Sequence, residues 1–283
     1  MQGFTLFNGV CMPALGYGTF QITNAALCEQ CVENALDAGY RLFDTAAFYR
    51  NEEAVGHAIC SSNIPRKEIF VTTKLWVQDT GYDNTLKAFD LSLKKMGLEY
   101  IDLYLIHQPF GDIYGAWRAM ERLYREGAVR AIGVSNFSPE RLVDLCMNHE
   151  IKPMVNQIEI HPFYQQGDAI KVMRDYGVIP QAWGPFSEAQ KDIFHHNTLE
   201  KIAKKHSKST AQVILRWHYQ RGVSAIPKTV HKDRMEENLN IFDFALTDRE
   251  MESIAAMDIG HSEIIDHRCY CTARQLNSVK IHA

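Results

Sequence analysis

Short apolar runs alternate with longer amphipathic runs over nearly the whole chain. The apolar runs have the length and composition of β-strands that are buried on both faces. Several of them end in a polar or charged residue. Eight such runs occupy residues 13–18, 42–44, 69–74, 101–107, 129–135, 154–159, 178–183 and 223–227.

The segments between these runs have apolar residues at helical spacing, most clearly in residues 25–38 and 83–96. Gly39 and Gly97 follow these two segments, at the position where a helix C-cap favours glycine. Strands that alternate with helices in this way predict a parallel sheet with helices packed against it.

Eight strand–helix units over 283 residues predict an α/β fold, a closed (β/α)8 barrel, as a single domain of residues 1–283. Residues 1–12 differ, because Asn8-Gly9 lies between short alternating runs and indicates a β-hairpin with a tight turn. We expect this hairpin to close the N-terminal end of the barrel.

A doubly wound dinucleotide-binding sheet is the rival fold, and its phosphate loop carries the pattern GxGxxG. The nearest candidate, Gly16-Tyr-Gly18-Thr-Phe-Gln21, lacks the third glycine. The chain also has no GxxxxGK[ST] loop. A nucleotide would therefore have to bind without either loop.

Composition narrows the possible partners. The formal net charge is −4 at pH 7, so no basic face is indicated and we expect no nucleic-acid partner. The first residues carry no positive charge and no long apolar segment, and no run approaches the roughly 18 apolar residues of a membrane span. We expect a cytoplasmic monomer that contacts no membrane and keeps its seven cysteines as reduced thiols.

Two cysteine patterns resemble metal motifs, but neither has a second pair at zinc spacing. Cys28 and Cys31 fall on the apolar face of a predicted helix, where buried thiols are the expected state. His267, Cys269 and Cys271 place three potential ligands within five residues, which rarely closes a tetrahedral site. We therefore predict no metal site.

Four ionisable residues follow or end consecutive predicted strands. Asp44, Lys74 and His107 end three of them, and Tyr49 lies in the loop after the first. Because the carboxyl ends of barrel strands meet at one mouth, we expect these side chains to converge there. A nearby ammonium favours phenolate and is expected to lower the pKa of Tyr49, which makes the phenol a better proton donor. Such a set suits protonation of a carbonyl oxygen.

Three segments resemble signatures of the aldo-keto reductase family. These are GYRLFDTAAFYRNEEAVG (39–56), VRAIGVSNF (129–137) and IPKTVHKDRMEEN (226–238), within a resemblance that covers about residues 15–257. It implies a TIM barrel, NADPH as cofactor, and reduction of a small-molecule aldehyde or ketone to an alcohol. The sequence AWGPF (182–186) is similar to that of small microbial members, such as 2,5-diketo-gluconate reductases.

The resemblance also implies roles for individual residues. Tyr49 would be the general acid, Asp44 and Lys74 its tuning pair, and His107 the group that orients the substrate. Aromatic side chains with one polar neighbour would line the substrate pocket, and the tail at 258–283 would lie near it. The expected substrate-binding residues are Phe20, Phe48, Trp76, His107, Gln108 and Phe110.

The implied cofactor site draws on several strand ends. Trp183 would stack on the nicotinamide, whose amide suits the side chains of Ser135, Asn136 and Gln157. Lysine and arginine after the last strand suit the 2′-phosphate of NADPH. The remaining expected cofactor residues are Gly18, Thr19, Asp44, Phe186, Ser187, Lys228, Thr229, Val230, Arg234, Glu237 and Asn238.

Two other classes of function remain open at this point. Lys74 or Lys228 could form a Schiff base, as in barrel aldolases. A non-catalytic role is also known for relatives of this fold, although this chain has all four expected catalytic residues.

Overall fold

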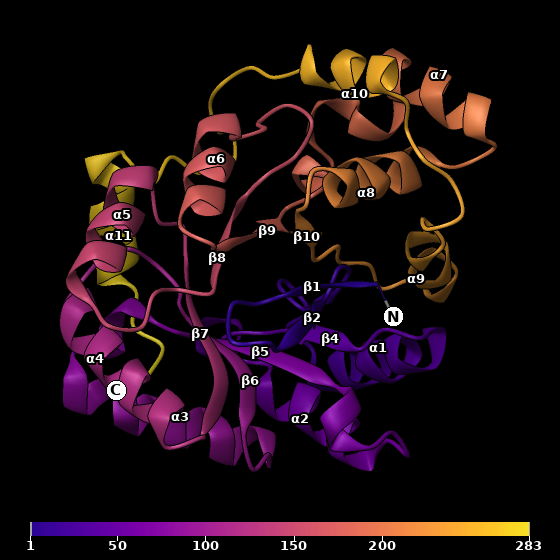
Figure 1. The fold of residues 1–283 in the computed structure, drawn as a ribbon. Coiled ribbons are helices and arrows are strands. Elements are labelled where there is room, and N and C mark those ends of the chain that lie inside the picture. Colours follow the sequence, from indigo (N-terminus) through magenta and orange to yellow (C-terminus); the bar gives the residue numbers. More distant parts are fainter. Residues whose placement is uncertain (1, 283) are drawn as a thin grey trace.

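The computed structural model describes residues 2–282. Eight parallel strands form one sheet in sequence order from β3 to β10, and the helices surround it (Figure 1). The strands are β3 (Tyr17–Gly18), β4 (Leu42–Asp44), β5 (Phe70–Leu75), β6 (Ile101–Ile106), β7 (Val129–Ser135), β8 (Val155–Glu159), β9 (Ile179–Trp183) and β10 (Ser224–Ala225).

The first and last parts of the sheet meet, which closes the ring. Leu15 and Ala225 form a parallel bridge. The Gly16 amide donates to the Ala225 carbonyl at 2.9 Å, and the Gly18 amide donates to the Pro227 carbonyl at 3.0 Å. The predicted (β/α)8 barrel is therefore confirmed.

The predicted N-terminal hairpin is present as β1 (Gly3–Thr5) paired antiparallel with β2 (Cys11–Pro13). Leu6 and Met12 of this segment are buried in a cluster with Leu42, Phe70 and other residues from the early parts of the barrel strands. The hairpin thus covers the N-terminal end of the barrel, which leaves the opposite end for a ligand.

Helices cover the outer face of the sheet. Asn24 caps the first one through its side chain, and Gly39 ends it with φ of 107°. The helices are α1 (Ala25–Ala38), α2 (Glu52–Ser61), α3 (Tyr82–Met96), α4 (Ile113–Arg125), α5 (Pro139–Asn148), α6 (Gly167–Asp175), α7 (Asn197–His206), α8 (Thr210–Gln220), α9 (Lys232–Leu239), α10 (Asp248–Ala255) and α11 (Tyr270–Ser278). Short 3-10 segments are η1 (Ala47–Tyr49), η2 (Arg66–Glu68), η3 (Val77–Asp79) and η4 (Ser187–His195).

Within residues 2–282, the buried apolar residues form two clusters, an inner core inside the barrel and an outer core between the sheet and the helices. The inner core is the cluster that contains Leu42 and Phe70. The outer core packs helix residues such as Val32 and Trp117 against the sheet. Cys28 and Cys31 belong to it as free, buried thiols, as predicted for the first cysteine pattern. The polar strand ends are left above the inner core, at the mouth opposite the hairpin.

Candidate active site

The four predicted ionisable residues meet at this mouth. Asp44 is the last residue of β4, Lys74 lies near the end of β5, and His107 directly follows β6. Tyr49 ends η1, and Arg50 after it turns the chain with φ of 57°. The barrel therefore brings together side chains that lie up to 63 positions apart, since residues 44 and 107 bound the set.

A buried ion pair forms the centre of this cluster. The Lys74 ammonium donates to Asp44 Oδ1 at 2.5 Å, to the Thr45 carbonyl at 3.0 Å and to the Tyr49 hydroxyl at 3.2 Å. Gln157 donates to the other Asp44 oxygen at 2.7 Å. Each of the three ammonium hydrogens thus has an acceptor. The acceptor on Tyr49 is the phenol oxygen.

Burial dominates the electrostatics of the cluster. It raises the pKa of Asp44 and lowers the pKa of Lys74, while the attraction between the two opposes both shifts. Burial also raises the pKa of Tyr49 well above its ordinary value of 10, and the Asp44 charge adds to that rise. The expectation that Lys74 lowers the pKa of Tyr49 is wrong here, because Asp44 balances the ammonium charge and burial disfavours the charged phenolate.

His107 is neutral at physiological pH. Burial, followed by the charge of Lys74, holds its pKa well below the usual 6.5. Its ring stands edge-on to Tyr49, with centroids 5.5 Å apart, and to Trp76, with centroids 5.3 Å apart. A neutral imidazole can donate one hydrogen bond into the mouth beside Tyr49.

A cavity of about 630 Å³ opens over this cluster. Its apolar walls include Phe48 and Trp76, whose rings stack at 4.2 Å. The predicted residues that line it are Gly18, Phe20, Asp44, Phe48, Tyr49, Trp76, His107, Gln108, Ser135, Asn136, Gln157, Trp183, Phe186, Lys228 and Arg234.

One side of this cavity presents amides and an indole held in fixed orientations. The Trp183 indole N–H donates to Asn136 Oδ1 at 2.8 Å, and the Asn136 amide donates to the His107 carbonyl at 3.0 Å. Ser135 donates to the Gln157 carbonyl at 2.8 Å. Asn136 adopts φ of 63°, a conformation that asparagine tolerates better than most residues.

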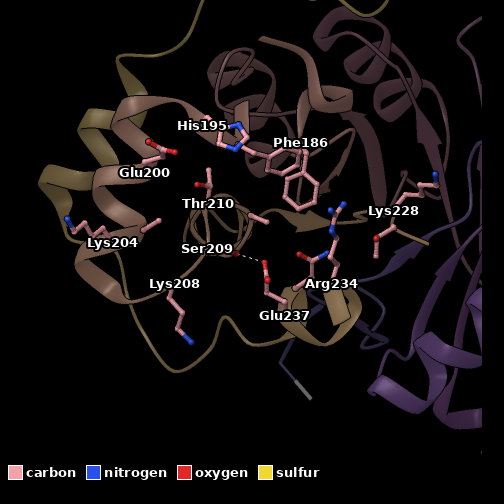
Figure 2. A pocket seen from close by; sticks show the side chains of 15 residues that line it. Phe186, His195, Glu200, Lys204, Lys208, Ser209, Thr210, Lys228, Arg234 and Glu237 are labelled. Carbon is pink, nitrogen blue, oxygen red and sulfur yellow. Dashed lines mark hydrogen bonds between the residues drawn. The ribbon is translucent and has the colours of Figure 1, made fainter. Parts of the chain in front are cut away.

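A second cavity, of about 750 Å³, shares Phe186, Phe194, Lys228 and Arg234 with the first. Figure 2 shows cationic side chains around it, among them Lys204, Lys228 and Arg234. The Ser209 hydroxyl donates to a Glu237 carboxylate oxygen at 2.5 Å. Thr229, Glu237 and Asn238, three of the residues predicted from the sequence, also line it. The two cavities are therefore adjacent, with the four shared residues between or beside them.

Several predicted residues lie outside both cavities. Thr19 is fully buried and donates to the Asp44 carbonyl at 2.9 Å. Lys74 lies beneath the cavity floor, behind Tyr49 and Asp44. Ser187, Val230 and Phe110 also do not line either cavity.

Other lining residues were missed from the sequence. The tail contributes Ile264, Ile265, His267 and Leu276 to the first cavity. Only the Asp266-His267-Arg268 sequence and the expected position of the tail pointed towards them. Lys204 of α7 and Ser209 before α8 line the second cavity, and no local sequence pattern distinguishes them from surface residues.

Comparisons with known proteins identify the family of this chain. Residues 14–259 match the aldo/keto reductase family. The chain belongs to the aldo/keto reductase family, and it is therefore an oxidoreductase. Within residues 2–282, no helix is long and apolar enough to cross a membrane, and no cluster of three or more His, Cys, Asp or Glu side chains could hold a metal ion.

Individual relatives resemble the chain over most of its length. It is 47% identical over 258 residues to a glyoxal reductase of Bacillus subtilis (strain 168), covering 89% of this chain and 91% of that one. The structure of an aldo-keto reductase from a Medee basin deep-sea metagenome library superposes with a TM-score of 0.92 at 43% identity, covering 94% and 98%. An aldo-keto reductase of Bombyx mori in complex with NADP gives 0.89 at 34% identity, covering 94% and 95%.

Proposed function

We propose that this protein reduces aldehydes and ketones to alcohols with NADPH, and that Tyr49 is the general acid. The observation that carries this assignment is the 3.2 Å hydrogen bond from the Lys74 ammonium to the Tyr49 oxygen. Because the phenol oxygen accepts from Lys74, its own proton is free to point into the cavity. The raised pKa of Tyr49 keeps that proton in place at neutral pH.

The residues of the two adjacent cavities suit a dinucleotide with a 2′-phosphate. Lys204, Lys228 and Arg234 line the second cavity, and none of them forms an ion pair within residues 2–282. These cations suit an anionic group, and arginine suits a phosphate in particular. At the other end, Trp183 and the amide of Asn136 offer a flat face and polar partners to a nicotinamide. The NADP bound to the Bombyx mori relative supports the same cofactor here.

Each member of the cluster then has a defined task. NADPH, when bound, supplies a hydride to the carbonyl carbon. Tyr49 donates its proton to the carbonyl oxygen, and the Lys74 ammonium stabilises the phenolate that remains. His107, neutral and edge-on to Tyr49, donates a hydrogen bond that holds the carbonyl oxygen near the phenol.

The substrate range is proposed from the cavity walls. Phe20, Phe48 and Trp76 favour apolar or flat carbonyl compounds, and Gln108 adds one amide. The glyoxal reductase relative supports small aldehydes among the substrates. Reduction of keto-sugar acids, as in 2,5-diketo-gluconate reductases, stays a prediction that depends on the sequence AWGPF at residues 182–186.

The Schiff-base alternative is disfavoured for Lys74. Its side chain is 0% exposed, and its three N–H groups are all engaged by Asp44, Thr45 and Tyr49. A carbonyl carbon would have to displace one of these contacts to reach the nitrogen. Borohydride trapping with substrate tests the alternative for Lys228, which is exposed.

The test of the proposal is Tyr49→Phe, assayed with a panel of aldehydes and ketones and with NADPH and NADH in parallel. We expect kcat to fall by about 10²–10⁴-fold, with the dissociation constant of NADPH unchanged, because only the proton donor is lost. Tyr270→Phe is the matched control, since that side chain is 81% exposed and outside both cavities. Near-parental turnover in Tyr49→Phe would overturn the assignment. NADPH binding with no carbonyl reduced by the parent would favour a non-catalytic role.

A further inference from the structure

A pair of cysteines at the start of α11 has no part in the proposed reaction. Cys269 and Cys271 are free thiols separated in sequence by one residue, Tyr270. Neither lines either of the two cavities described above. Cys269 caps the helix, because its sulfur accepts a hydrogen bond from the Cys271 amide at 3.3 Å. Cys271 is exposed and Cys269 partly so, so both sulfurs are open to small reagents.

The surroundings of Cys269 favour its thiolate. The backbone N–H of Thr272, then that of Cys271, and then the Cys271 thiol lower the pKa of Cys269, while Asp266 opposes the shift. The hydrogen bond from the Cys271 amide holds the Cys269 sulfur 3.3 Å from the backbone nitrogen of the residue that carries the second thiol. Buried thiols elsewhere behave differently, since burial raises the pKa of Cys28 to about 12. A thiolate with a second thiol beside it is the arrangement of a redox-sensitive pair.

A metal site does not account for this pair. Within residues 2–282 no cluster of at least three His, Cys, Asp or Glu side chains could hold a metal ion. His267, the nearest nitrogen ligand along the chain, lines the catalytic cavity. The two thiols are therefore available to react with each other or with small molecules from solvent.

We propose that Cys269 and Cys271 form a peroxide-sensitive dithiol, in which Cys269 reacts first and Cys271 closes an intramolecular disulfide. The Cys269 thiolate attacks one oxygen of hydrogen peroxide, the O–O bond breaks, and the leaving hydroxide takes up a proton to become water. Cys271 sulfur then attacks the sulfenic acid at Cys269, an S–S bond forms, and a second water leaves. Two electrons pass from the dithiol to the peroxide.

The pair lies on the segment that forms one wall of the substrate cavity. Leu276 of α11 lines that cavity, and the Trp76 indole donates to the Val279 carbonyl just after the helix at 2.9 Å. A disulfide between the cap residue and the first turn changes the start of this helix. The oxidation state of the pair is thus connected to the cavity wall through nine helical residues, Tyr270–Ser278.

The experiment uses full-length protein treated with hydrogen peroxide, quenched by alkylation and digested with trypsin. Cleavage after Arg268 and Arg274 releases one peptide, CYCTAR, that contains both cysteines and no other. We expect the mass of this peptide to fall by two hydrogen atoms as the disulfide forms. The rate of this oxidation should exceed the rate of Cys60 oxidation by about tenfold or more. Cys60 is the reference because it is also an exposed thiol. Reduction with dithiothreitol should restore its mass.

Two variants make the order of events testable. In Cys271→Ser we expect a dimedone adduct at Cys269 and no internal bridge, and in Cys269→Ser we expect Cys271 to react no faster than Cys60. Cys60→Ser is the matched control and should leave the bridge unchanged. Oxidation of CYCTAR no faster than Cys60, or a sulfenic acid at Cys269 that never closes onto Cys271 in the parent, would overturn the proposal.

Discussion

Replacing Asp44 by asparagine removes the only negative charge that contacts the buried ammonium of Lys74 within residues 2–282. The side chains of Lys74 and Asp44 are 0% and 2% exposed. The other two acceptors of the ammonium, Thr45 and Tyr49, are neutral. The variant therefore leaves a charge in a site that water does not reach.

The cost follows from this burial and from a second mismatch. Leaving one partner of a buried ion pair uncompensated destabilises a protein by about 3–5 kcal/mol. Both Asp44 oxygens accept hydrogen bonds, one from Lys74 at 2.5 Å and one from Gln157 at 2.7 Å. Asparagine has one oxygen, so its amide N–H₂ must face one of these two donors. We expect the free energy of unfolding to fall by about 3–5 kcal/mol.

The assay is thermal unfolding at pH 7, followed by circular dichroism. A loss of that size lowers the melting midpoint by roughly 6–20 °C. Asp90→Asn is the control, because Asp90 is exposed on α3 and its replacement should change little. The double variant Asp44→Asn with Lys74→Met should regain much of the loss, since it buries no unpaired charge. The reasoning fails if Asp44→Asn melts with the parent, or if the double variant is less stable than the single one.

Two further predictions concern packing and pH. In Gly56→Ala the new Cβ would lie 2.1 Å from the Met96 carbonyl oxygen, so α2 must shift and the unfolding free energy should fall by about 1–3 kcal/mol in urea titrations. Gly167→Ala, with nothing within 4 Å of the new Cβ, is the control, and equal midpoints would refute the packing argument. Burial lowers the pKa of His267 from 6.5 to about 4, although Glu159 and Asp266 oppose the shift. A depressed histidine pKa means that the folded tail binds fewer protons than the free tail, so docking of the tail weakens by about 3 kcal/mol as the pH falls from about 6.5 to about 4. Hydrogen exchange of residues 262–278, corrected for intrinsic rates, should show this loss in the parent and not in His267→Gln, and equal protection in both would contradict it.

The sequence predicted the parts of the site that depend on strand periodicity. Asp44, Lys74 and His107 lie at or beside strand ends, and a parallel barrel brings such ends to one mouth whatever the loops do. The family resemblance, rather than periodicity, pointed to Trp183 and Gln157, which also line the cavity. The boundaries were less accurate at the first strand, predicted at 13–18, because Pro13 pairs in the hairpin and β3 covers only Tyr17–Gly18.

The parts that were missed depend on contacts between distant segments. Ile264, Ile265 and Leu276 reach the cavity because the tail folds back over the barrel, held in part by the Ser262 hydroxyl bond to Glu159 at 2.6 Å. No periodic pattern marks such a contact. Lys204 likewise lines the second cavity only because α7 lies beside the loop after β9.

The pKa of Tyr49 shows why residue types alone did not determine the electrostatics. The sequence places a lysine and a phenol together, and from these two residues a lowered phenol pKa is the natural expectation. The structure adds that Asp44 contacts Lys74 more closely, at 2.5 Å, than Tyr49 does, at 3.2 Å. The carboxylate offsets the ammonium charge felt by the phenol, and burial then raises the pKa of Tyr49. Asp44 therefore acts on Lys74 first: it opposes the burial that would deprotonate the ammonium. In the proposed reaction this keeps a charged donor against the Tyr49 oxygen, where the phenolate forms, while the phenol retains the proton that it must deliver.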